Sequence, residues 1–91
     1  MSNEELVERI KQGENSLMSD LYMNCRRFII AIIKHIGIEQ AEDCEDAMQD
    51  AYFGLYEAVK GFDESKGYKF LTYAKYHIQT AIQRGKLKSS D

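Results

Sequence analysis

The sequence predicts an all-α fold, in the form of a compact domain of three to four helices. The chain has 91 residues with six glycines and no proline, and it is 44% hydrophobic and 30% charged. This composition is typical of a globular protein with long uninterrupted helices. Apolar residues recur at spacings of three and four, which is the period of a helix with one buried face. A chain this short buries only about 60 to 65% of its unfolded surface, so we expect modest stability.

Capping residues and apolar stripes indicate the first two helices. Asn3 can cap a short first helix, because the two acids that follow it suit a positively polarised first turn, and Gly13 ends that helix. Ser16 can cap a second helix, for which Gly37 is the expected stop. The apolar stripes consist of Leu6, Val7 and Ile10 in the first helix, and of Leu17, Leu21, Cys25, Phe28, Ile29, Ile32, Ile33 and Ile36 in the second.

The second half of the chain predicts two further helices joined by a loop. The third should run from about Gln40 to Lys60, with Gly61 as a left-handed terminating residue, and the fourth from about Phe70 to Gly85. We place the domain at residues 3–85 and expect residues 86–91 to form a disordered tail or the start of a linker. The inward residues are Met48, Ala51, Leu55, Ala58, Val59 and Phe62, then Phe70, Ala74, His77 or Ile78, Ala81 and Ile82.

The charge of the chain changes sign along its length. The net charge is −3, which argues against a protein that holds DNA mainly through its own phosphate contacts. It leaves open a DNA-reading subunit held in place by a larger partner. Acids predominate from Glu39 to Glu64, whereas Ser65 to Ser90 contains basic residues and no acid. The sequence therefore predicts two electrically different surfaces.

Catalytic and metal-binding patterns are absent from the sequence. Cys25 and Cys44 lack the spacing of a zinc site or a disulfide framework, and we assign His35 and His77 a packing or surface role. There is no glycine-rich phosphate loop, nucleophile elbow or HExxH motif. We therefore expect no cofactor, no metal and no enzymatic activity. Because no basic leader or long apolar run is present, we also expect a cytoplasmic protein without a membrane partner.

Removing the core residues from the third helix leaves an outward face of acids, an amide and two aromatic rings. Acids on such a face are most often merely solvated, whereas exposed rings among them favour a surface for a partner protein. Both interpretations stay open on these residues alone. The face consists of Asp46, Gln49, Asp50, Phe53, Tyr56 and Glu57.

The fourth helix has an outward line of Tyr73, Tyr76, Thr80 and Gln83, at spacings of three, four and three. Aromatic faces stack unpaired bases at about 1 to 3 kcal/mol each, and Thr and Gln can hydrogen-bond base edges. The alternative is that one or both tyrosines fold back onto the second helix and that Phe62 is simply core. Basic residues that could contact phosphates are Lys69, Lys75, Arg84 and Lys86.

Two segments, DAMQDAYFGLYEAVKGFD at residues 46–63 and GYKFLTYAKYHIQTAIQR at residues 67–84, resemble region 2 of the bacterial RNA polymerase sigma-70 family. The resemblance covers roughly residues 5–84 and implies a sigma factor that binds core RNA polymerase. In that family the helix matching residues 46–59 binds a coiled coil on the clamp of the largest polymerase subunit. The matching contact positions are Asp46, Gln49 and Asp50, followed by Gly54 and Leu55 as in the family pattern.

The resemblance also implies a site for promoter DNA. The positions matching Phe62, Asp63, Lys66, Tyr73 and Tyr76 form the pocket and wedge for the adenine that flips out of the single-stranded non-template minus-ten element. Flipping costs a few kcal/mol, so a prebuilt pocket captures the open state. The DNA-binding residues we expect are Phe62, Asp63, Lys66, Lys69, Thr72, Tyr73, Lys75, Tyr76, Gln79, Thr80, Gln83 and Arg84.

The departures from the family point to an alternative sigma factor. Where primary sigma factors read WWIRQAI, residues 76–82 read YHIQTAI, and the smaller wedge and lost cation should weaken melting. A rival interpretation is a sigma-like decoy or regulator, for instance from a mobile element, that binds the polymerase clamp without opening DNA. A third is a helical DNA-binding module independent of polymerase, which the net charge disfavours. An anti-sigma factor is a further candidate partner.

Overall fold

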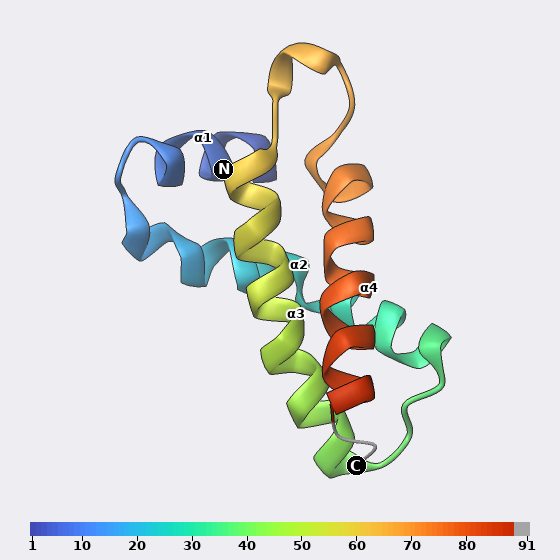
Figure 1. Cartoon of the computed structure of the whole chain (residues 1–91). Coiled ribbons are helices and arrows are strands. Elements are labelled where there is room, and N and C mark those ends of the chain that lie inside the picture. Colours follow the sequence, from blue (N-terminus) through green and yellow to red (C-terminus); the bar gives the residue numbers. More distant parts are fainter. Residues whose placement is uncertain (89–91) are drawn as a thin grey trace.

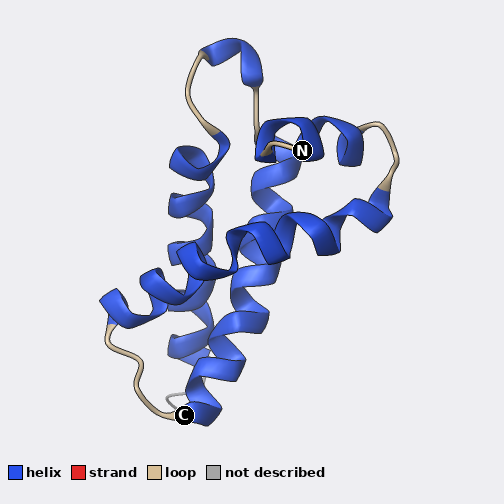
Figure 2. Cartoon of the chain, turned by 180° about the vertical axis from the view of Figure 1, so that it is seen from behind, coloured by secondary structure: helices blue, strands red, loops and turns tan. Residues whose placement is uncertain are grey.

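The computed structural model describes the backbone of residues 1–88 and the side chains of residues 1–85. Within this range the chain is all-α, as predicted, and contains no strand. Figure 1 shows the last two long helices running antiparallel, side by side, and Figure 2 shows α2 crossing that pair. The helices are α1 (Asn3–Lys11), α2 (Met18–Ile36), α3 (Ala41–Gly61) and α4 (Phe70–Lys88), with short 3₁₀ helices η1 (Asn15–Leu17) and η2 (Glu64–Lys66).

The first two helices begin differently from the sequence prediction. Ser2, rather than Asn3, caps α1, because its hydroxyl accepts from the Glu5 amide at 3.1 Å while the Glu5 carboxylate accepts from the Ser2 amide. Ser16 lies inside η1, and α2 begins without a side-chain cap. The end of α2 was predicted correctly: Gly37 terminates it with a φ of 94°, which a residue with a side chain rarely adopts.

Gly61 and the end of α4 also differ from expectation. Gly61 is the last residue of α3 and has no positive φ, so it is not a left-handed terminator. A Cβ at Gly61 would instead meet the hydroxyl of Tyr73, so this contact with the end of a side chain favours a glycine there. Helix α4 continues past Gly85 to Lys88, and the rest of the expected tail, residues 89–91, lies outside the described part of the chain.

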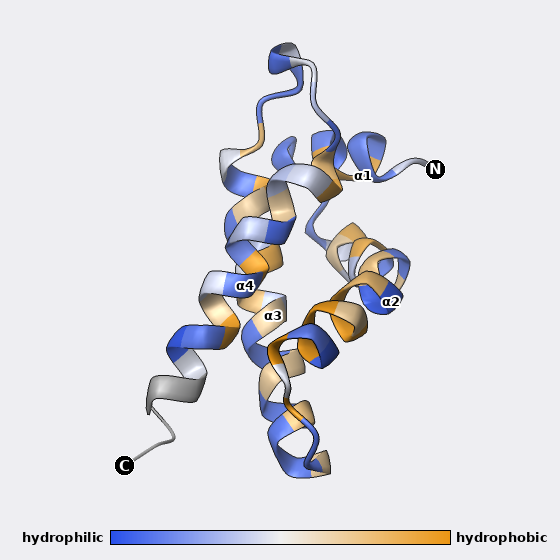
Figure 3. Ribbon diagram, turned by 90° about the vertical axis from the view of Figure 1, so that its right-hand side faces the viewer, coloured by the Kyte–Doolittle hydropathy of each residue, from blue (hydrophilic) through white to orange (hydrophobic). Residues whose placement is uncertain are grey.

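The core is apolar and lies where α1 and α2 meet the pair of α3 and α4. The described part of the chain buries no polar or charged side chain. Figure 3 shows hydrophobic residues of α2 on the side that faces α3. Ile78 is buried while His77 is only half-buried, so Ile78 is the inward residue of that pair. The predicted core residues that are buried include Ile29, Ile32, Ile33, Leu55, Val59, Phe62, Phe70, Ala74 and Ile82.

Helices α3 and α4 approach each other closely because α3 presents small residues to α4. A Cβ added to Gly54 would lie 2.7 Å from the carbonyl oxygen of His77, 2.9 Å from the Cα of Ile78 and 3.0 Å from the Cβ of Ala81. These distances are below ordinary contact, so the two backbones touch at Gly54. Alanines extend the close contact along α3, whose buried residues include Ala47, Ala51 and Ala58.

Candidate functional site

The outward face of α3 combines carboxylates with uncovered rings. Phe53 is 68% exposed and Tyr56 is 41% exposed, so two large side chains on this face lie open to solvent. The Lys60 ammonium lies 5.0 Å from the centre of the Tyr56 ring and 3.8 Å from a Glu57 carboxylate oxygen. The remaining predicted members Asp46 and Gln49 are exposed too. Lys60 was not predicted as part of this face, although its spacing of four from Tyr56 could have indicated it.

Asp50 does not point straight outward as the sequence pattern predicted. It is half-buried, and its carboxylate lies so close to Gly85 of α4 that a Cβ at Gly85 would overlap it. The carboxylate therefore lies at the junction of α3 and α4, in the space that a side chain at position 85 would need. Gly54, which belongs to the same sequence motif, is buried. Its presence in the motif is explained by the contact between the helices.

A cluster of aromatic rings lies at the start of α4 and in the loop before it. The rings of Tyr68 and Tyr73 are stacked, with centroids 5.8 Å apart and an angle of 8° between their planes. Tyr73 also contacts His77 at 4.8 Å, and His77 meets Tyr76 edge-on at 6.2 Å. Tyr76 is 72% exposed, whereas Tyr73 is half-buried. We call Tyr68, Tyr73, Tyr76 and His77 the ring cluster.

Phe62 lies beneath the ring cluster and is itself core. Only 2% of it is exposed, and it contacts Phe70 edge-on at 5.3 Å and Tyr73 at 5.9 Å. Its ring can therefore support the cluster from below but is not open to a ligand. Tyr73 packs on this ring and is half-buried, so it is partly folded back rather than fully outward. Tyr76 points outward, as predicted. Tyr68 was not predicted as a site residue, although it belongs to the GYKF segment that resembles the family.

Polar and basic side chains lie on α4 and in the loop before it, the two segments that carry the ring cluster. Gln79 and Thr80 are half-buried, and the Thr80 hydroxyl donates to the carbonyl of Tyr76 at 2.9 Å, so that only its lone pairs remain for a ligand. No acid lies between Ser65 and Gly85. The side chain of Lys86 lies outside the described residues. The exposed predicted DNA contacts are Asp63, Lys66, Lys69, Thr72, Lys75, Gln83 and Arg84.

The loop that joins α3 to α4 is shaped by Asp63. One oxygen of its carboxylate accepts from the Ser65 hydroxyl at 2.6 Å and from the Ser65 amide at 3.0 Å. These hydrogen bonds lower the pKa of Asp63, and the nearby Lys66 and Lys11 act in the same direction. Gly67 closes the turn with a φ of 83°. The loop thus has a defined shape and a charged carboxylate at neutral pH.

The cysteines and histidines form no metal site in the part of the chain that the structure describes. Burial raises the pKa of the Cys25 thiol to about 11, with a smaller effect from the Glu4 carboxylate. Cys44 is half-buried, and its thiol donates to the carbonyl of Ile38 at 3.7 Å. Among the described helices, none is long and apolar enough to cross a membrane.

The chain is similar to known bacterial sigma factors. Residues 21–90 match the family described as Sigma-70 region 2. The chain is 36% identical over 80 residues to "RNA polymerase sigma factor SigA" of Clostridium acetobutylicum, which is 88% of this chain and 21% of that protein. It is 37% identical over 81 residues to "RNA polymerase sigma factor SigA2" of Synechococcus elongatus, covering 89% of this chain and 25% of that protein.

A third relative, "RNA polymerase sigma factor SigA" of a Bacillus species, is 35% identical over 80 residues, which cover 88% of this chain and 21% of that protein. The chain therefore spans between a fifth and a quarter of the length of these curated relatives. No solved structure gave a significant match.

Proposed function

Because this chain belongs to the sigma-70 region 2 family, we propose that it binds core RNA polymerase and recognises and melts the minus-ten element of a promoter at transcription initiation in the bacterial cytoplasm. The observation that carries the proposal is the presence of two different surfaces on adjacent helices. The outward face of α3 is rich in acceptors and has two exposed rings, whereas the ring cluster lies on α4 and the loop before it, a segment with exposed cations and no acid after Glu64. The first suits a basic protein partner, and the second suits single-stranded DNA.

The polymerase surface is assigned to Asp46, Gln49, Asp50, Phe53, Tyr56 and Glu57. Carboxylate and amide oxygens accept charge-assisted hydrogen bonds from a basic coiled coil, and such bonds orient a dock and speed its formation. Aromatic rings are enriched in protein interfaces, and tyrosine is frequent among the few residues that carry most of the binding energy. Phe53 is the natural anchor, because it is the more exposed of the two rings.

The DNA surface is assigned to the ring cluster and the residues around it. Tyr76 has the most open ring and suits stacking on an unpaired base of the non-template strand. Lys66, Lys69, Lys75 and Arg84 are free to contact phosphates. Since the net charge of the chain is −3, DNA binding should depend on polymerase to hold the strand in place.

A second candidate function is a sigma-like decoy that occupies the polymerase clamp without opening DNA. The position of Tyr73 favours it, because this ring is half-buried on Phe62. On α4 only the ring of Tyr76 is largely exposed within the described residues. One exposed ring offers few stacking contacts to unpaired bases, so it would stabilise melted promoter DNA only weakly. The two candidates share the polymerase surface and differ only in what the ring cluster does.

Polymerase binding is tested with a double substitution of two exposed residues, Asp46→Ala with Gln49→Ala. Asp50 is left intact, because its carboxylate lies against Gly85 and its loss would disturb the packing of α3 on α4. The matched control is Asp20→Ala with Asn24→Ala, which removes the same two kinds of group from the exposed side of α2. We expect the first variant to lose the polymerase clamp in a pull-down while the control retains it. Equal retention by both folded variants would remove the polymerase assignment.

The melting role is tested on Tyr76, with the variants Tyr76→Ala and Tyr76→Phe. In complex with polymerase, the alanine variant should lose about 1 to 3 kcal/mol of affinity for a single-stranded oligonucleotide, whereas phenylalanine keeps the stacking face and most of the affinity. The oligonucleotide is the one that the wild-type complex selects from a random-sequence pool. If the complex selects no sequence, or if Tyr76→Ala binds and opens promoters normally, the decoy function is favoured.

A further inference from the structure

The loop at residues 63–69 joins α3 to α4 at one end of the pair, where it projects beyond the helices (Figure 1). It carries Asp63, Lys66 and Tyr68 of the proposed DNA surface, and most of its side chains are exposed. Hydrogen bonds at Asp63 shape its turn, but apart from the ring of Tyr68 the side chains described for this loop make no packing contact that would fix it relative to the helices. The relative position of its two ends therefore decides where those side chains stand, and both ends are held by the same distant helix, α1.

Lys11, the last residue of α1, holds the first end of the loop. Its ammonium donates to the carbonyl of Phe62 at 2.7 Å, in a part-buried setting. Phe62 follows directly after the last residue of α3, so a cation placed there also suits the negative end of that helix. The bond fixes the point at which the chain leaves α3 and enters the loop.

Glu4, near the start of α1, holds the second end. Its carboxylate accepts from the backbone amide of Phe70 at 2.8 Å, again in a part-buried setting. Phe70 is the first residue of α4, and the residue before it is Lys69, whose side chain cannot accept a hydrogen bond. A carboxylate from another helix thus takes the place of the local side-chain cap that α4 lacks at Lys69.

The two contacts act together because both come from α1, a single helix that is anchored in the core. Glu4 and Lys11 are seven residues apart, which is about two helical turns and roughly 10.5 Å. They therefore lie on one face of α1. Between them Val7 and Ile10 are buried in the core, and the capping box at Ser2 secures the start of the helix. Figure 2 shows α1 beside the base of the loop.

We propose that α1 is a positioning element for the DNA-reading loop, with Glu4 and Lys11 setting the separation of the loop's ends and hence the geometry of the ring cluster. The inference rests on the proposed function for its consequence in DNA binding. Its structural part, the ordering of the loop, stands independently of that function. The polymerase surface lies elsewhere, on α3, so substitutions in α1 should separate DNA binding from polymerase binding.

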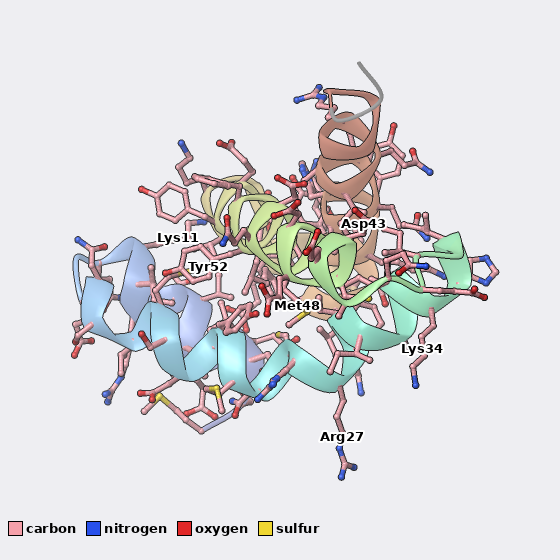
Figure 4. The ribbon with its side chains drawn as sticks, turned by 90° about the horizontal axis from the view of Figure 1, so that it is seen from below. Lys11, Arg27, Lys34, Asp43, Met48 and Tyr52 are labelled. Carbon is pink, nitrogen blue, oxygen red and sulfur yellow. The ribbon has the colours of Figure 1, made fainter. Side chains whose placement is uncertain are left out.

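The test compares Glu4→Ala with Glu4→Gln, and Lys11→Met with Lys11→Arg. Glutamine keeps an acceptor and arginine keeps a donor. Glu4→Gln should therefore retain the contact that Glu4→Ala loses, and Lys11→Arg should retain the contact that Lys11→Met loses. The control for Glu4 is Glu8→Ala, since Glu8 is an exposed acid on the same helix, and the control for Lys11 is Lys34→Met on α2. Figure 4 labels Lys11 and Lys34 and shows that they belong to separate parts of the molecule.

Two measurements are made on each variant of the 91-residue chain. The first is amide hydrogen exchange of the free protein, in which Glu4→Ala and Lys11→Met should speed exchange in residues 63–70 and leave the amides of α2 unchanged. The second is affinity of the polymerase complex for the selected single-stranded oligonucleotide, which should fall about tenfold for each of these variants. Clamp binding should remain at the wild-type level, and Glu4→Gln, Lys11→Arg and both controls should behave like wild type.

The results that would overturn the inference are distinct from those that would overturn the proposed function. Unchanged exchange in the loop, or equally faster exchange throughout α2, would show that the two residues do not position the loop. Faster loop exchange with unaltered oligonucleotide affinity would remove the link to DNA reading. If the wild-type complex selects no oligonucleotide, the proposed melting role is wrong, and the exchange data still decide whether α1 orders the loop.

Discussion

The close approach of α3 and α4 at Gly54 makes an unusual prediction for Gly54→Ala. In a helix interior, alanine is ordinarily favoured over glycine by about 1 kcal/mol. Here the new methyl group would lie 2.7 Å from a backbone oxygen of His77 and 2.9 Å from the Cα of Ile78. Backbone atoms cannot move aside by changing a rotamer, so α4 itself must shift.

The size of the effect follows from two opposing contributions. Overpacking of a well-packed core costs about 1 to 3 kcal/mol, and three close contacts at Gly54 place this case at the upper end. After subtraction of the gain in helix propensity, we expect a net loss of about 2 kcal/mol in the free energy of unfolding. For a domain of this size the melting temperature should fall by roughly 8 to 16 °C. Circular dichroism during thermal and urea unfolding measures both quantities.

Gly61 provides the control, because a methyl group there would meet only the end of a side chain, the Tyr73 hydroxyl. In a Tyr73→Phe background this obstacle is removed. Gly61→Ala should then raise stability by up to about 1 kcal/mol. An increase in melting temperature for Gly54→Ala, similar to that of the Gly61 control, would refute the reasoning, since it would mean that the two backbones do not touch at Gly54.

Three further predictions concern the core, the buried thiol and the basic surface. Leu55 is fully buried, so Leu55→Ala should lower the free energy of unfolding in urea by about 2 to 5 kcal/mol; a loss below about 1 kcal/mol would place Leu55 outside the core. Burial holds the folded-state pKa of Cys25 at about 11, above its ordinary 9.0, so its contribution to stability is present below pH 9 and is lost as pH rises towards 11. Wild type should therefore lose more stability than Cys25→Ala between these pH values, and parallel curves would contradict the buried thiol. Lys75→Ala should weaken polymerase-dependent DNA binding at all sequences and reduce its salt dependence, whereas Lys34→Ala on α2 should leave both unchanged; equal effects would exclude a specific phosphate contact.

The helices and the core were predictable from the sequence because both depend on a local period. Leu55 and Val59 are four residues apart, so both lie on the face of α3 that is buried. Gly37 ends α2 in a left-handed conformation, which depends only on the local backbone and can therefore be predicted from the sequence. The site was predictable only in outline. An outward pattern on one helix cannot reveal that another helix covers part of it, which is why Asp50 was expected outside but lies against Gly85.

The same limit explains the errors at Gly61 and in the ring cluster. A glycine at a helix end predicts a left-handed residue, whereas at Gly61 it is the Tyr73 hydroxyl from the next helix that disfavours a side chain. Tyr73 follows an outward spacing, yet Phe62 in the preceding loop offers it an apolar surface. Contacts between segments that are distant in the chain leave no periodic signal, so the bonds of Glu4 and Lys11 could not be inferred either.

The dependence of the loop on α1 has a consequence for the order of events during protein synthesis. Glu4 and Phe70 are 66 residues apart, and Lys11 and Phe62 are 51 apart. At about 5 to 20 residues per second, the ribosome adds Phe70 roughly 3 to 13 s after Glu4. Helix α1 is therefore synthesised several seconds before its partner at the start of α4. A nascent or truncated chain that ends before α4 lacks the amide that donates to Glu4. Only a chain that includes α4 can therefore assemble the loop geometry.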